Sequence, residues 1–292
     1  MSRILDSSTP IVIQGLTGRA GAVYTSACRA AGANIVAGVV PGRGGDEFDG
    51  IPIFDTVYAA RDKTGCTLSC IFVPGAHALD AAAEAADAGI STVICCSRRV
   101  PLVDATHMVA LAARGHIRLL GPSAPGIIVP GHAAIGALSP EIFRPGHAGI
   151  ASRSTSLSRM VIYEMTAAGI GQSALIGVGA DPIVGTTLID ALRMLEEDEA
   201  TRTIVAIGGP SGLHESLLPD IIRDEIDKPV IALMPYIAMP IPRIDGYAEA
   251  LLHEEIDPEE TVAALADAGV TVVTVPEDVP RVLAEAAQRN AV

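Results

Sequence analysis

Two glycine-rich segments near the start of the chain have the residue types to hold an anionic ligand. Residues 15–21 (GLTGRAG) lie between an apolar run and an alanine-rich run, and residues 41–45 (PGRGG) place Arg43 after the next apolar run. Glycine lets a backbone approach a phosphate, and a helix N-terminus offers free N–H groups. Each segment alone is also typical of an ordinary turn, and the glycine spacing is not the dinucleotide pattern. Because loops after neighbouring parallel strands meet at one sheet edge, the two together predict a nucleotide-like ligand.

The composition limits the classes to which the protein can belong. The chain has 292 residues, of which 49% are hydrophobic, and a formal net charge of −14. An acidic protein repels phosphate backbones, so we expect no nucleic-acid partner. There is no N-terminal signal pattern and no apolar stretch of about 18 residues, which favours a soluble, cytoplasmic protein with no membrane partner. The five cysteines lie in apolar contexts without metal-ligand spacing, so we expect buried thiols and no metal site.

Short β-branched runs alternate with alanine-rich runs in both halves of the chain, which predicts βαβ units and parallel sheets. In the first half we expect strands at 10–14, 34–40, 69–73, 91–95 and 117–120, and helices at 21–31, 77–88 and 104–114. In the second half we expect strands at 149–152, 173–178, 203–207, 230–234 and 270–274, and helices at 156–168, 184–197, 212–224, 259–268 and 279–288. The fold class is therefore α/β with two doubly wound domains. A Rossmann-like domain is expected at 1–125, a Pro- and Gly-rich linker at 126–147, and a flavodoxin-like domain at 148–292.

Five motifs, found in order along the chain, carry a specific resemblance. They are residues 14–21, 41–45, 121–126 (GPSAPG), 152–154 (SRS) and 177–183 (GVGADPI). With them the chain resembles the succinyl-CoA synthetase α subunits from near its first residue to its last. The resemblance implies a CoA-binding first domain and a ligase second domain, with CoA contacts at Thr17, Gly18, Arg19, Ala20, Arg43, Cys96, Ser97 and Arg98. Arg43 replaces the usual Lys and Arg98 the usual Glu, so the adenosine end of the site is expected to differ.

The resemblance implies a site in the second domain where a phosphohistidine and two helix N-termini hold the transferred phosphate. This site, here called the phosphate station, is altered in this sequence. By resemblance, Tyr247 stands at the phosphohistidine position, where a phenol of pKa about 10 is a poor phosphoryl acceptor at neutral pH. Glu249 adds negative charge beside it. Thr155 stands where a glycine lets phosphate approach, and Gly209 stands where a glutamate assists the histidine. The implied phosphate cradle consists of Ser154, Thr155, Ser156, Ser211 and Gly212. These changes together predict a changed mechanism or a lost step.

Three other histidines are candidates to replace the missing acceptor. His147 lies in a PGHAG segment that looks like the phosphohistidine motif but precedes the SRS motif. His214 lies near a predicted helix start, and His253 lies six residues beyond the tyrosine. An ordinary surface histidine is the more common interpretation of each. Asp181, in a turn after a strand, is expected to cap the helix that follows it.

We expect an enzyme subunit that pairs with a separate ATP-grasp β-type subunit in a heterodimer or heterotetramer. The complex would activate a small carboxylic acid with ATP, with ATP and Mg on the partner subunit, and transfer the acyl group to CoA or another nucleophile. The apolar loop at residues 235–242 is a candidate for substrate contact or for an interface. Two alternatives stay open. One is an ATP-independent acyl or carbamoyl transferase, and the other is a non-catalytic CoA-sensing subunit.

Overall fold

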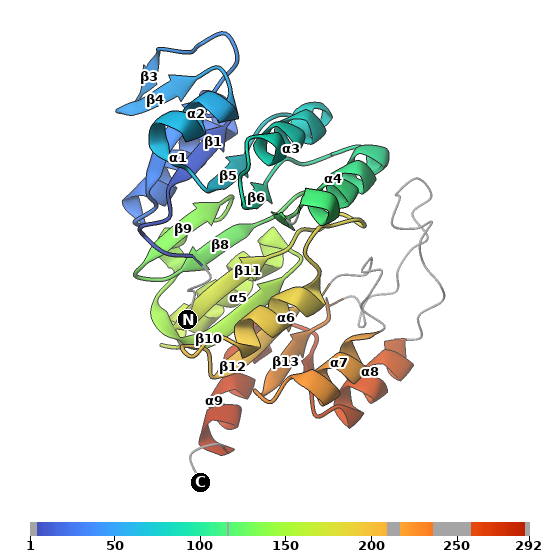
Figure 1. Ribbon diagram of the computed structural model, residues 1–292. Helices are drawn as coiled ribbons and strands as arrows, with labels where there is room; N and C mark the ends of the chain where they lie inside the picture. The colour runs from blue at the N-terminus through green and yellow to red at the C-terminus, as the bar shows by residue number, and fades with distance from the viewer. Residues whose placement is uncertain (1–4, 116, 209–216, 236–257, 290–292) are drawn as a thin grey trace. The chain divides into compact units, whose positions relative to one another are not determined.

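The computed structural model describes residues 5–115, 117–208, 217–235 and 258–289 (Figure 1). These residues form two compact units. The first comprises the chain up to Glu141 together with residues 183–186, and the second comprises residues 142–182 and the chain from Thr187 onward. Within the described ranges, no helix is both long enough and apolar enough to span a membrane.

The first unit is built on a mostly parallel sheet with the strand order β3-β4-β2-β1-β5-β6-β7. Its strands are β1 (Ile11–Gln14), β2 (Ile35–Val39), β3 (Glu47–Phe48), β4 (Ile51–Phe54), β5 (Leu68–Ile71), β6 (Thr92–Cys95) and β7 (Arg118–Leu120). Its helices are α1 (Arg19–Ala30), α2 (Val57–Thr64), α3 (Ala78–Asp87) and α4 (Leu102–Gly115). Apart from β3, which pairs antiparallel with β4, the order is that of the Rossmann fold. Strands β2 and β4 are added on one side of β1, and β5, β6 and β7 are added on the other side. The boundary between β1 and β5 is therefore the switch point where such folds bind ligands.

Small and β-branched side chains explain why these elements pack as they do. β1 and β5 are buried along their whole length, as central parallel strands covered on both faces must be. Helix α3 buries alanines at helical spacing against the sheet, namely Ala78, Ala81, Ala82 and Ala85. Helix α2 is capped at its N-terminus by Thr56, whose side chain accepts a hydrogen bond from the Ala59 amide (3.1 Å), and at its C-terminus by Gly65 with φ of 68°.

The second unit has five parallel strands in the order β14-β13-β12-β10-β11. They are β10 (Pro145–Ser152), β11 (Gln172–Gly177), β12 (Thr203–Ile207), β13 (Val230–Leu233) and β14 (Thr271–Val273). The helices are α5 (Thr155–Ala167), α6 (Leu188–Glu196), α7 (Leu218–Glu225), α8 (Pro258–Asp267) and α9 (Val279–Arg289). This is the flavodoxin-like order, so the predicted fold class of two doubly wound α/β domains is confirmed.

The segment expected to be a linker, residues 126–147, contains regular structure. It holds the antiparallel hairpin of β8 (Gly126–Val129) and β9 (Ala133–Gly136), the short helix η2 (Pro140–Ile142) and the start of β10. Gly126 and Gly136 have φ of 112° and 142°, and a Cβ on Gly126 would lie 2.2 Å from the Ile135 carbonyl oxygen. These glycines are therefore sites of close backbone approach within a hairpin, and their abundance does not mark an unstructured connection. β9 packs against α1, and the Cys28 Sγ lies 3.7 Å from the Gly136 carbonyl.

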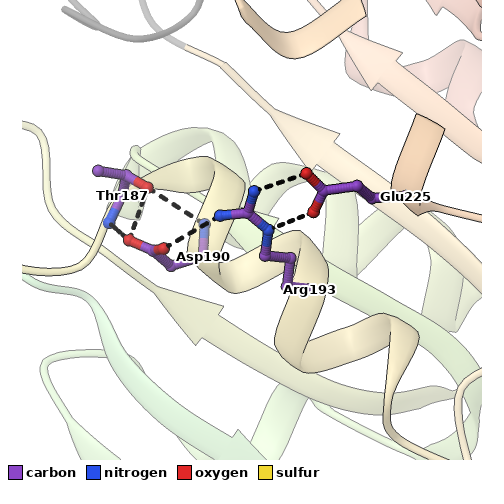
Figure 2. Close-up of polar contacts among 4 residues, drawn as sticks. All are labelled: Thr187, Asp190, Arg193 and Glu225. Carbon is purple, nitrogen blue, oxygen red and sulfur yellow. Dashed lines mark hydrogen bonds and ion pairs between the residues drawn. The ribbon is translucent and has the colours of Figure 1, made fainter. Parts of the chain in front are cut away.

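A polar cluster sets the start of α6 and joins that helix to α7 (Figure 2). Thr187 caps α6 by accepting a hydrogen bond from the Asp190 amide (3.1 Å), and the Asp190 carboxylate accepts in return from the Thr187 amide (2.8 Å). Arg193 then donates two hydrogen bonds to the Glu225 carboxylate (2.6 and 2.8 Å), which holds the pKa of Glu225 below its usual value. The expectation that Asp181 caps this helix is wrong, because Thr187 does so. The helix consequently begins at Leu188 instead of the predicted residue 184.

Candidate functional site

The register of the first sheet aligns the carboxyl ends of its strands. Gln14, the last residue of β1, pairs with Val39 of β2 on one side and with Ile71 of β5 on the other. Val39 pairs in turn with Phe54 of β4, and β6 follows β5 in step, with Cys95 opposite Ile71. The loops that follow β1, β2, β4, β5 and β6 therefore leave the same edge of the sheet. That edge carries both of the glycine-rich segments that the sequence marks.

The turn between β1 and α1 is shaped for a close approach of backbone to a ligand. Gly15 has φ of 81°, and a Cβ on Gly21 would lie 2.2 Å from the Gly15 carbonyl oxygen, so both positions require glycine. The N-cap of α1 is Gly18, which offers no side-chain cap, and the first turn holds no acidic residue. The positive end of this helix is thus left for an outside anion, in contrast to the self-capped α6. Of the four residues predicted here, Thr17 is half-buried, and the other three are exposed, namely Gly18, Arg19 and Ala20.

The loop after β2 carries Arg43, and hydrogen bonds to its backbone on both sides of this residue fix the loop. Arg43 is about half exposed, and its Nε donates to the Asp46 carboxylate at 2.9 Å. The Asp55 carboxylate, which directly follows β4, accepts hydrogen bonds from the amides of Gly42 (2.7 Å) and Gly44 (2.9 Å). Sequence reasoning missed Asp55. No local pattern marks it, because only the pairing of β2 with β4 brings it to this loop.

The loop after β6 contributes one exposed side chain among its three predicted contacts. Cys96 and Ser97 are buried, whereas Arg98 is exposed. The Ser97 hydroxyl donates to the Val73 carbonyl oxygen at 2.6 Å and so ties this loop to the one after β5. The role of Ser97 in the structure is therefore to position the loop, while Arg98 is the side chain available to a ligand.

The thiols beneath these loops are packing groups. All five cysteines are buried. Cys70 lies 3.9 Å from Cys96, measured between the Sγ atoms. Burial raises the pKa of Cys70, and it raises the pKa of Cys28 to about 12. Cys28 and Cys70 therefore stay protonated at neutral pH, and a protonated, buried thiol is a poor nucleophile.

In the second unit, the predicted cradle residues Ser154, Thr155 and Ser156 lie at the start of α5. Ser154 is the N-cap, and its Oγ accepts a hydrogen bond from the Leu157 amide at 3.2 Å. The turn is fixed from below by Ser152 and Ser158, whose buried hydroxyls are 2.7 Å apart. Thr155 is the first helical residue, so its side chain stands at the very start of the helix, where the resemblance predicts a glycine in the usual motif.

Arg153 ties this turn to the loop after β11. The side chain is buried and its Nη2 donates to the Asp181 carbonyl oxygen at 2.9 Å. Asp181 takes part in this contact through its backbone carbonyl. The remaining residues named for the station lie outside the described residues, namely Gly209, Ser211, Gly212, His214, Tyr247, Glu249 and His253, together with most of the loop at 235–242.

His147 is excluded from the station at the start of α5 by its place on β10. It is the third residue of a strand whose far end, Ser152, leads into that helix. Five residues of strand span about 16 Å. The imidazole Nδ1 instead lies 3.1 Å from the Ala200 carbonyl oxygen at the other end of the sheet.

Comparison with known proteins agrees with this geometry. Residues 6–98 match the CoA binding domain family, and that segment contains β1, α1, the Arg43 loop and the end of β6. The α subunit 2 of an ADP-forming succinate–CoA ligase from Archaeoglobus fulgidus is 37% identical over 286 residues, which is 98% of this chain and 99% of that protein. The chain belongs to the succinate–CoA ligase α-subunit family.

Two further similarities concern the whole chain. The succinate–CoA ligase α subunit of Staphylococcus aureus is 34% identical over 289 residues, covering 99% of this chain and 96% of that protein. Among solved structures, the ATP citrate lyase of Methanothrix soehngenii, in complex with citrate and coenzyme A, superposes with a TM-score of 0.83 at 20% identity. That match covers 99% of this α-type chain but only 52% of the lyase chain, and it supports the fold alone.

Proposed function

We propose that this protein is the CoA-binding α-type subunit of an ADP-forming acid–CoA ligase. Its reaction joins a small carboxylic acid to the CoA thiol while ATP is split to ADP and phosphate. ATP and Mg are bound by a separate ATP-grasp β-type subunit. The resemblance implies a phosphohistidine in the usual members of the family, and this protein works without one.

The observation that carries the proposal is the uncapped start of α1 at the switch point of a Rossmann-like sheet. An anionic pyrophosphate fits there, because the helix end offers amides and a positive dipole while glycines keep the approach open. We infer that CoA is held by Thr17, Gly18, Arg19 and Ala20 in this turn, by Arg43, and by the loop of Cys96, Ser97 and Arg98. An acidic chain with charge −14 needs such a local site to bind an anion.

The inferred loss of the relay rests on Tyr247 and on the start of α5. Tyr247 stands at the acceptor position by resemblance, and Thr155 occupies the helix start where glycine is usual. Among the described residues of the second unit, His147 is the one histidine, and it lies at the opposite end of β10. We therefore propose that phosphate from ATP does not pass through this chain.

The first test is calorimetric titration of the protein with CoA. Arg43→Ala should weaken binding about 10–100-fold, the usual value of a charge-assisted contact. Arg114→Ala is the matched control. Arg114 is an exposed arginine in the last turn of α4, so its replacement removes the same charge away from the proposed site. Absence of CoA binding by the wild-type protein, alone and with its partner, would refute the proposal.

The second test uses the protein co-purified with an ATP-grasp subunit and supplied with Mg, labelled ATP, CoA and a panel of small carboxylic acids. We expect thioester, ADP and phosphate as products, with no acid-labile phosphate on this chain. Phosphohistidine at His147, His214 or His253 would show that the relay has moved. Thioester formed without ATP would support an ATP-independent transferase, and CoA binding without any turnover would support a sensing subunit.

A further inference from the structure

We propose that Asp55 is a positioning residue that holds the β2–β3 loop so that Arg43 binds a CoA phosphate through its guanidinium. The inference rests on the proposed CoA site and adds a residue to it. Asp55 lies twelve positions from Arg43 in the sequence but directly follows β4, the strand that pairs with β2.

The contacts of Asp55 bracket the arginine. Its Oδ1 accepts from the amide before Arg43, that of Gly42, at 2.7 Å, and from the amide after it, that of Gly44, at 2.9 Å. A Cβ on Gly44 would lie 2.3 Å from Asp55 Oδ2, so this approach of the carboxylate depends on glycine at that position. The backbone on both sides of Arg43 is thereby fixed to the sheet.

A second carboxylate fixes the side chain itself. Asp46 accepts from Arg43 Nε at 2.9 Å, with both side chains about half exposed. A guanidinium has five N–H donors in a planar fork, so binding at Nε leaves the Nη edge for a second partner. Asp55 therefore sets the backbone of the loop, and Asp46 sets the direction of the guanidinium.

This arrangement also decides which groups of the loop can meet a phosphate. A loop with successive amides pointing inward can bind an anion by its backbone alone. Here the Asp55 carboxylate already fills that role for Gly42 and Gly44. Phosphate recognition at this loop must then come from the guanidinium, whereas at the start of α1 it comes from backbone amides.

The amide analogue separates geometry from charge. Asparagine at position 55 keeps an oxygen that can accept both amide hydrogen bonds but carries no negative charge near the bound phosphate. Asp55→Asn should therefore bind CoA at least as tightly as the wild type. Asp55→Ala removes the acceptor and frees the loop, so that CoA must supply the ordering itself.

A double-mutant cycle on CoA affinity tests the inference with Asp55→Ala, Arg43→Ala and the pair. Asp55→Ala should weaken binding about ten-fold in the wild type but less than about two-fold when Arg43 is already alanine, because coupled residues are non-additive. Asp62→Ala, on the exposed face of α2, removes the same charge and should leave the affinity unchanged. If Asp55→Ala proves unstable, Gly44→Ala tests the same point, since its Cβ displaces the carboxylate and should weaken binding similarly.

Equal losses in both backgrounds would show that Asp55 acts independently of Arg43 and would overturn the inference. Unchanged CoA binding by Asp55→Ala would also overturn the inference. Tighter binding would overturn it too, and would show that the Asp55 carboxylate competes with the ligand. Normal CoA binding by the wild type in either case leaves the proposed function standing. No binding by the wild type would remove both.

Discussion

Replacement of Gly21 by alanine tests whether the β1–α1 turn is built as tightly as its geometry indicates. Gly21 is a buried residue in the first turn of α1, and its φ is not in the left-handed region. Alanine favours an α-helix over glycine by about 1 kcal/mol, so helix propensity alone predicts a more stable protein. The packing of the turn predicts the opposite.

The magnitude follows from the position of the added Cβ. It would lie 2.2 Å from the Gly15 carbonyl oxygen and 2.9 Å from that of Leu16. An unstrained carbon–oxygen contact is about 3.3 Å, so the turn must open by about 1 Å. Overpacking of this kind costs about 1–3 kcal/mol, and the upper part of that range applies because both obstacles are backbone. We expect Gly21→Ala to lower the free energy of unfolding by about 1–2 kcal/mol after the gain in helix propensity.

The assay is urea unfolding followed by circular dichroism, combined with CoA titration of the folded variant. The control is Ser26→Ala, at an exposed position of the same helix, where alanine should stabilise slightly. CoA affinity should fall in Gly21→Ala, because the displaced turn carries the amides at the start of the helix. A variant as stable as the wild type with unchanged CoA affinity would refute the reasoning.

Three further predictions concern the stability of the fold. Burial raises the pKa of Cys28 from 9.0 to about 12, so its unfolded form loses a proton before its folded form does. The stability should therefore fall as pH rises above about 9, by about 1.4 kcal/mol per pH unit for this thiol, and Cys28→Ala should flatten that slope in alkaline unfolding curves. Thr187→Ala should lower the free energy of unfolding by about 1 kcal/mol by removing the α6 cap, whereas Thr187→Ser should change it little in thermal melts. Because Arg193 lowers the pKa of Glu225, the ion pair stabilises the protein above pH 4.5 and is lost as pH falls below it. Glu225→Gln should weaken both that acid dependence and the salt dependence of stability, and an unchanged acid limb would contradict the assignment.

The sequence by itself determined the fold class, the order of most of the elements and the glycine-rich turn after the first strand. Each of these rests on local pattern. The central strands β1, β5, β11 and β12 are apolar runs of four to six residues, and the glycines at 15, 18 and 21 lie where the first strand gives way to the first helix. The same local reasoning missed α2 and the strands β3, β4, β8 and β9, which are short or mixed in character.

Only the tertiary structure decided which residues meet. The register of β4, β2, β1, β5 and β6 brings the five loops to one edge, and it places Asp55 beneath the Arg43 loop. The same information excluded His147 from the station at the start of α5 and gave the cap of α6 to Thr187 instead of Asp181. The physical reason is that hydrophobic period and turn chemistry act over a few residues, whereas pairing between strands joins residues far apart in the chain.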